Sequence, residues 1–129
     1  MPFRRVVLLE GEATTPFRDE VDRLRSALRS KGIGIVSEGG DGFIALPGGV
    51  PGLDLLFAHL DGHDLPCGLL NSSGYYRDLL KHTPDSVMDR FVRESQRGRL
   101  IVQHDPDALV QAMVEYAPPE TRRQGALPE

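Results

Sequence analysis

The chain has 129 residues, of which 40% are hydrophobic and 26% charged, and this composition suffices for one globular core. Its net charge of -4 argues against a nucleic-acid partner, because binding phosphates over a large footprint requires a clustered excess of Lys and Arg. The single cysteine, Cys67, excludes an intramolecular disulfide and cannot by itself form a thiolate zinc site. The first apolar run is interrupted by Glu10 after four residues, so we expect no secretion signal or membrane span and a cytoplasmic protein.

The first half of the chain predicts three strands and two helices. Apolar runs at 6–9, 33–36 and 43–46 indicate short buried strands. Thr15 and Pro16 predict the start of a helix, as N-cap and first-turn residues, and Gly32 predicts its end. Helical spacing returns after the glycines at 48–52 and runs over residues 53–60.

The second half continues the alternation of strands and helices. Strands are expected at 67–70 and 100–102, a helix from Tyr75, a helix begun by Thr83 and Pro84, and a last helix opened by Asp105 and Pro106. This order predicts an α/β protein with a mainly parallel sheet of about five strands between helix layers, a three-layer α/β/α sandwich. We expect one domain over residues 1–117 and a mobile tail over 118–129.

Two glycine-containing turns follow strands of this sheet. Gly11 comes after the first strand, and Pro47, Gly48 and Gly49 come after the third. Ligands of open α/β sheets bind at the carboxyl ends of the strands, and glycines before a helix allow backbone amides to approach a phosphate. The Pro-Gly-Gly turn therefore predicts either a phosphate cradle or an ordinary tight connection, and the sequence leaves both open.

Several motifs in order resemble the Lonely Guy (LOG) family, nucleoside 5'-monophosphate phosphoribohydrolases that activate cytokinins and that were often called lysine decarboxylases. They are "VVLLEGE", "RSKGIGIVSEGG", "FIALPGGVPGLDLLF" and "LPCGLLNSSGYYRDLL". The resemblance covers nearly the whole chain. It implies a Rossmann-like domain, a nucleotide as small-molecule ligand, no cofactor, no metal, and a homodimer.

The chain departs from the family pattern where the chemistry is expected. The family motif Pro-Gly-Gly-x-Gly-Thr-x-x-Glu ends in a glutamate, whereas alignment on Pro47 puts Pro51, Gly52 and Leu55 at the Gly, Thr and Glu positions. The family arginine of a Met-x-x-Arg-Lys segment has no counterpart, because a block is missing between Gly40 and Asp41. Both groups serve N-glycosidic cleavage in the family, so their absence predicts AMP hydrolysis near background.

Two carboxylates are candidate replacements for the missing glutamate. Asp54 neighbours the vacant position, but adjacent helix residues point about 100° apart, and an acidic residue in a first helical turn also suits the helix dipole. Glu38, like Glu12, follows a strand, where it would repel a phosphate unless it is paired or protonated. The candidate ligand-binding residues are Gly11, Gly39, Gly40, Pro47, Gly48, Gly49, Val50 and Gly52.

Other chemistry-bearing residues have simpler interpretations. His59 and His63 have the i, i+4 spacing of metal ligands, but Gly62 and Pro66 end the helix there, so a surface loop is favoured over a metal site. Tyr75 and Tyr76 are expected to pack their helix rather than to stack on a base. The leading hypothesis is binding of a nucleotide or phosphate ligand without efficient hydrolysis. The alternatives are an active phosphoribohydrolase that uses Asp54 or Glu38, and a structural or regulatory self-association module.

The missing block also affects the chain connection. In the family the second and third strands lie parallel on opposite sides of the first, and here only residues 37–42 join them. A crossover between parallel strands normally takes about a dozen residues, so a single chain is not expected to make it. Residues 37–42 then form a hairpin turn between antiparallel strands, or residues 1–37 complete the sheet of a second chain in a domain-swapped dimer. We favour the swapped dimer.

Overall fold

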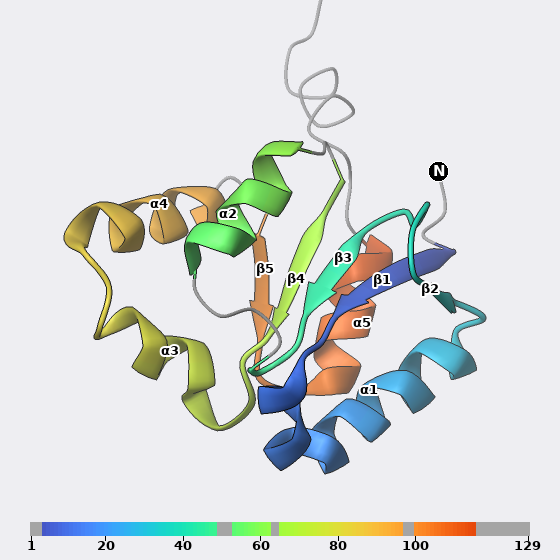
Figure 1. The fold of residues 1–129 in the computed structure, drawn as a ribbon. Helices are drawn as coiled ribbons and strands as arrows, with labels where there is room; N and C mark the ends of the chain where they lie inside the picture. The colour runs from blue at the N-terminus through green and yellow to red at the C-terminus, as the bar shows by residue number, and fades with distance from the viewer. Residues whose placement is uncertain (1–3, 49–52, 63–64, 97–99, 116–129) are drawn as a thin grey trace, which may run out of the picture.

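The computed structural model describes residues 4–48, 53–62, 65–96 and 100–115, and these contain a five-stranded sheet (Figure 1). All four strand pairs are parallel, and the strand order is β2-β1-β3-β4-β5. The predicted α/β fold with a parallel sheet is therefore confirmed. The strands are β1 (Arg5–Leu9), β2 (Gly34–Val36), β3 (Phe43–Ala45), β4 (Cys67–Leu70) and β5 (Leu100–Gln103).

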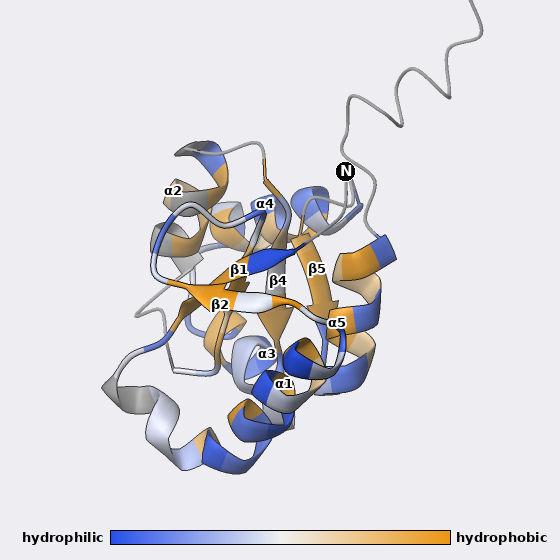
Figure 2. Ribbon diagram, turned by 90° about the vertical axis from the view of Figure 1, so that its right-hand side faces the viewer, coloured by the Kyte–Doolittle hydropathy of each residue, from blue (hydrophilic) through white to orange (hydrophobic). Residues whose placement is uncertain are grey.

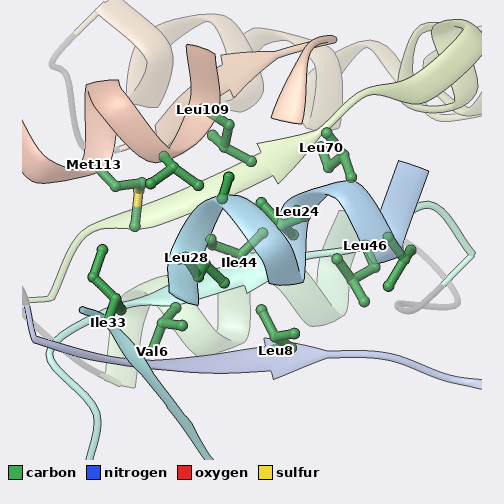
Figure 3. Packing of buried hydrophobic residues seen from close by; sticks show 13 residues of the cluster. Val6, Leu8, Leu24, Leu28, Ile33, Ile44, Leu46, Leu70, Leu109 and Met113 are labelled. Atoms are coloured by element: carbon green, nitrogen blue, oxygen red, sulfur yellow. The ribbon is translucent and has the colours of Figure 1, made fainter. Parts of the chain in front are cut away.

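Helices cover both faces of the sheet, because successive strand residues point to opposite sides. On β1, Val6 and Leu8 face a core with α1 and α5 (Figure 3), whereas Val7 and Leu9 face a second core with α2, α3 and α4. The result is a three-layer, Rossmann-like sandwich. The helices are α1 (Arg18–Ser30), α2 (Leu53–Gly62), α3 (Tyr75–Leu80), α4 (Asp85–Gln96) and α5 (Pro106–Glu115), with 3-10 turns η1 (Glu12–Phe17) and η2 (Ser72–Gly74).

Two predicted helix ends are confirmed. Gly32 follows α1 with φ of 74°, and the N–H of Ile33 donates to the carbonyl of Leu28, which closes the helix. At α5 the side chain of Asp105 accepts a hydrogen bond from the N–H of Ala108 (2.9 Å), as an N-cap does. That bond is the main cause that lowers the pKa of Asp105.

The start of the first helical segment differs from the prediction. Thr15 is not its N-cap, because the helical turn begins earlier, in η1. The hydroxyl of Thr14 accepts the N–H of Gly11 (3.3 Å), while the N–H of Thr14 donates to the carbonyl of Gly11 (3.0 Å). This reciprocal pair starts the 3-10 turn before Pro16, which then lies inside it.

The connection between β2 and β3 corrects the sequence analysis. β2 and β3 are both parallel to β1, lie on opposite sides of it, and are joined within one chain. The predicted hairpin is therefore wrong. The expectation that a single chain cannot make this connection is wrong as well. Val36 and Phe43 are both level with Val7, so the link need not return along a full strand and spans two strand spacings, about 10 Å. An exchange of residues 1–37 between chains is therefore not required to complete the sheet.

Glycines allow the link to pass close over β1. Gly39 has φ of 73°, and a Cβ on Gly40 would lie 3.2 Å from the N and Cγ2 of Val7. The carboxylate of Asp41 then accepts the N–H groups of Arg4 (2.9 Å) and Arg5 (3.0 Å). These contacts fix the link against the first half of β1.

None of the helices in the described ranges combines the length and the apolar character that a membrane span needs. The expected tail over 118–129 lies outside the described residues.

Candidate functional site at the carboxyl ends of β1 and β3

The two glycine-containing turns come together at the switch point of the sheet. β1 and β3 are neighbours, but the chain leaves β1 through α1 on one face and leaves β3 toward α2 on the other. Gly11 follows β1, and Pro47 and Gly48 follow β3. In open parallel sheets such a point leaves a crevice in which ligands bind.

The beginning of the Pro-Gly-Gly turn is held by hydrogen bonds. The N–H of Leu46 donates to the carbonyl of Leu9 (3.2 Å), and the hydroxyl of Tyr76 donates to the carbonyl of Leu46 (2.8 Å). Pro47 is buried, and Gly48 has φ of 76°, which favours glycine. The turn therefore leaves β3 in a fixed direction, braced by β1 and α3.

Asn71 positions the helix that carries this brace. Its N–H donates to the carbonyl of Gln103 (2.8 Å), and its side-chain oxygen accepts the N–H of Tyr76 (2.7 Å). The carbonyl of Asn71 accepts the N–H of Gly74 (3.2 Å). Asn71 thus joins the ends of β4 and β5 to the start of α3. The sequence analysis did not single it out, although an Asn before a Gly-Tyr-Tyr helix start is a capping signal.

Three aromatic rings lie beside this edge of the sheet. The ring of Tyr75 is in edge contact with Phe17 (5.6 Å between centroids) and with Tyr76 (5.0 Å). Tyr76 is 1% exposed, and this burial raises the pKa of its hydroxyl well above the usual range. The expectation that the tyrosines pack their helix is confirmed for Tyr76, while Tyr75 is half-buried.

Charged groups border the same edge. Both carboxylate oxygens of Glu10 accept hydrogen bonds from Nη2 of Arg25 (2.9 and 2.8 Å), so the acidic group beside Gly11 is paired. Arg77 lies over Gly74, where a Cβ would be 2.8 Å from its Nη2. Within the described part of the chain Arg77 is exposed and forms no ion pair. It is therefore a cation available next to the site.

The candidate residues of the β2–β3 link do not join this edge. Glu38 is exposed, and the residues on either side of it lie level with residues 5–7 of β1. Leu9, at the carboxyl end of β1, lies about 7 Å further along the strand than Val7. Gly40 packs closely on β1, and this contact explains the glycine at this position, so no bound ligand is needed to account for it. Gly11 lies at the edge, but its N–H is engaged by Thr14.

Other candidates fall partly outside the described residues. Gly49, Val50 and Gly52 lie there entirely, as does His63, so the structure does not describe the second half of the turn. Asp54 is in the first turn of α2, and its side chain is not described, nor is that of His59. Among the described residues no group of three His, Cys, Asp or Glu side chains could hold a metal ion.

Two hollows lie away from the carboxyl edge. One, of about 370 Å³, lies between α2 and α4, where the guanidinium of Arg90 sits 4.8 Å above the ring of Phe57 and pairs with Asp61. The other, of about 470 Å³, lies between α1 and α5 and is lined by Arg23, Ala27 and Asp107 among others. Both are open surface depressions between helices, with no described link to the glycine turns.

Comparison with known proteins points to one family. Residues 33–113 match the family model described as "Possible lysine decarboxylase". The chain is 42% identical over 83 residues to cytokinin riboside 5'-monophosphate phosphoribohydrolase LOG5 of Arabidopsis thaliana, covering 60% of this chain and 36% of the relative. It is 38% identical over 84 residues to the cytokinin riboside 5'-monophosphate phosphoribohydrolase of Rhodococcoides fascians, covering 61% and 42%. The matched part is thus less than half of either relative.

Proposed function

This chain belongs to the "Possible lysine decarboxylase" family, that of the LOG phosphoribohydrolases, and from that premise we propose that it binds a nucleoside 5'-monophosphate or another phosphate ligand with little or no hydrolysis. The observation that carries the proposal is the braced turn at the switch point. The hydroxyl of Tyr76 fixes the carbonyl of Leu46, and Gly48 has a positive φ, directly after the central strand β3. A fixed glycine turn between a parallel strand and a helix is suited to an anion.

The basis for weak hydrolysis is the residue set. Cleavage of an N-glycosidic bond requires a carboxylate that faces the developing oxocarbenium charge or activates water. The family alignment places Leu55 at the glutamate position, within the first turn of α2. Glu38, one of the two candidate replacements, lies in the link that is fixed over the first half of β1. Groups that act as a unit in catalysis fail together, so turnover is expected near background.

Ligand binding is tested by thermal shift with AMP, ribose 5-phosphate and adenosine. We expect AMP and ribose 5-phosphate to raise the melting temperature and adenosine to have little effect, because the phosphate is the recognised group. Gly48→Ala should abolish the shift by straining the turn. Gly32→Ala is the matched control, because Gly32 has nearly the same φ (74° against 76°) at the far end of α1. No shift with any phosphate, or equal shifts in both variants, would overturn binding at this turn.

Hydrolysis is tested separately by release of adenine from AMP. We expect none above background. Release on the order of 1 per second, a rate typical of enzymes, would show that the protein is an active phosphoribohydrolase. Asp54→Asn and Glu38→Gln would then identify the carboxylate, and the binding experiment would be unaffected by this outcome.

A further inference from the structure

The two arginines described at the carboxyl edge of the sheet differ in whether they have a partner. Hydrophilic residues gather on the helices, around strands that are mainly hydrophobic (Figure 2). Arg25 of α1 is bound to Glu10. Arg77 of α3 is exposed, and its side chain forms no ion pair or hydrogen bond with any described residue. The charge of Arg77 is therefore available to an anion at this edge.

The side chain of Arg77 folds back toward the start of its helix. Its Nη2, Nε and Cζ atoms lie 2.8, 3.3 and 3.5 Å from the position that a Cβ of Gly74 would occupy. The guanidinium thus fills the side-chain position of residue 74, directly before α3. Gly74 also has φ of 72°, so another residue there would be strained and would displace the guanidinium. The fold therefore places this cation at the beginning of α3.

The beginning of α3 and the Pro-Gly-Gly turn leave the sheet side by side. Ala45 of β3 pairs in register with Leu69 of β4. Gly48 and Ser72 each follow these residues by three positions, so the two connections start at the same height on neighbouring strands, about 5 Å apart. The hydroxyl of Tyr76 ties α3 to the carbonyl end of β3 (Figure 1). The guanidinium at the start of α3 therefore lies beside the turn.

We propose that Arg77 binds the phosphate of the ligand from the α3 side, opposite the Pro-Gly-Gly turn, an inference that rests on the proposed function. A guanidinium offers parallel N–H donors that match two phosphate oxygens, and these charge-assisted bonds are stronger than neutral ones. A terminal phosphate has enough oxygens to accept from the turn and from Arg77 together. One cation suits one terminal phosphate, whereas a nucleic-acid backbone requires a basic patch. The ligand class is therefore a small phosphate monoester.

The test measures the dissociation constant of ribose 5-phosphate by isothermal titration calorimetry. Arg77→Gln should raise it roughly 10- to 100-fold, and Arg77→Lys should recover part of the loss, because Lys keeps the charge without the fork. Arg29→Gln is the matched control. Arg29 is exposed in the last turn of α1, near the beginning of β2 and thus at the opposite edge, and has no ion pair among the described residues. Its loss should leave the affinity unchanged.

A second measurement separates recognition of the phosphate from a structural role. The wild type should bind AMP more tightly than 3',5'-cyclic AMP, whose phosphate is a diester with a single charge, and Arg77→Gln should narrow this difference. Urea unfolding without ligand should give the same stability for Arg77→Gln and the wild type, since the side chain has no described partner to lose.

The outcomes distinguish this inference from the proposed function. Absence of phosphate binding in the wild type would overturn both. If Arg77→Gln binds ribose 5-phosphate as tightly as the wild type while Gly48→Ala does not, the turn holds the phosphate and the role of Arg77 is overturned. Equal losses in Arg77→Gln and Arg29→Gln would reflect net charge alone and would overturn it as well.

Discussion

At the scale of single residues, Tyr76 connects two parts of the candidate site that are far apart in sequence. Its N–H is bound by Asn71 and its hydroxyl by the carbonyl of Leu46. Leu46 is fully buried, and a buried carbonyl needs a hydrogen-bond donor from the protein. The hydroxyl of Tyr76 is that donor. The tyrosine therefore contributes to both the core and the direction of the Pro-Gly-Gly turn.

Tyr76→Phe should lower the free energy of unfolding by about 1–2 kcal/mol, because a buried carbonyl loses its donor while the ring remains. Tyr75→Phe is the control, since the hydroxyl of this half-buried neighbour has no hydrogen bond in the described structure, and its effect should stay within about 0.5 kcal/mol. Urea unfolding measures both. Equal effects in the two variants would contradict the assigned hydrogen bond.

Asp41 makes the stability dependent on acid. Its pKa lies below the usual 3.8, chiefly because its carboxylate accepts the N–H of Arg4 and then that of Arg5, while partial burial opposes the shift. A depressed folded-state pKa stabilises the protein above the unfolded-state pKa, and this contribution is lost as the pH falls through the folded-state value. The carboxylate is thus a source of acid sensitivity in the link.

Asp41→Asn should therefore be less stable than the wild type at neutral pH. The difference should shrink below about pH 4 and vanish once Asp41 is protonated in the folded state, because Asn resembles the neutral acid. Urea unfolding across this pH range measures it. A difference that is constant with pH would mean that the charge of Asp41 does not stabilise the link.

At the scale of elements, the β2–β3 link depends on two glycines for different reasons. Gly39 needs a positive φ but has no atom within 4 Å of a Cβ position. Gly40 needs space, because the atoms that a Cβ would meet include the N of Val7 and the O of Arg5, which are backbone. One position therefore tolerates residues that adopt the left-handed conformation, and the other tolerates no side chain.

Gly39→Ala should cost about 1–2 kcal/mol of unfolding free energy, and Gly39→Asn should cost less, because Asn enters the left-handed region more easily. Gly40→Ala should cost about 1–3 kcal/mol by crowding, and Gly40→Asn at least as much. Chemical unfolding of the four variants gives the comparison. If Asn were better than Ala at both positions, crowding at Gly40 would be excluded.

At the scale of the whole molecule, the sheet joins two cores. The two cores draw on β1, β3, β4 and β5 from both faces, for example Ile44 and Phe43 on β3. Loss of packing on one face disturbs strands that the other face needs. The two layers are therefore expected to unfold together, as small single domains do.

Leu24→Ala in the α1 core and Leu56→Ala in the α2 core should each cost about 2–5 kcal/mol, since both side chains are fully buried. In a Tyr116→Phe background, with no tryptophan present, tyrosine near-ultraviolet dichroism reports on Tyr75 and Tyr76 of α3, and far-ultraviolet dichroism reports on the backbone. The two signals should change at the same denaturant concentration in both variants. Earlier loss of the tyrosine signal in Leu56→Ala would show that the faces unfold independently.

Local features of the chain were predictable because they depend on neighbouring residues. The strand at 67–70, the end of α1 at Gly32 and the start of α5 at Asp105 follow from apolar runs and capping residues, which act within a few positions. The position of the glycine turns after β1 and β3 was predictable for the same reason. The start of the first helical segment differed because the 3-10 turn begins at Gly11, whose N–H donates to the hydroxyl of Thr14, before Thr15 is reached.

Long-range features of the site were not predictable from residue patterns. The hydrogen bond from Tyr76 to Leu46 joins residues 30 positions apart. The hydrogen bond from Asn71 to Gln103 joins the ends of the neighbouring strands β4 and β5. Glu38 follows a strand, as a site residue would, but β2 ends level with Val7 and its link turns back over the first half of β1. A pattern along the sequence shows where a strand ends in the chain. It does not show how far along the neighbouring strands that end lies.

The sequence by itself determined the class of fold, the family and the two glycine turns, because hydrophobic period, capping and motif order are written in consecutive residues. Only the tertiary structure decided how residues 37–42 join β2 to β3, since that depends on the stagger of three short strands against one another. It also decided which groups hold the Pro-Gly-Gly turn in place and which strands form the two edges of the sheet. These properties depend on residues that are neighbours in space but distant in the sequence.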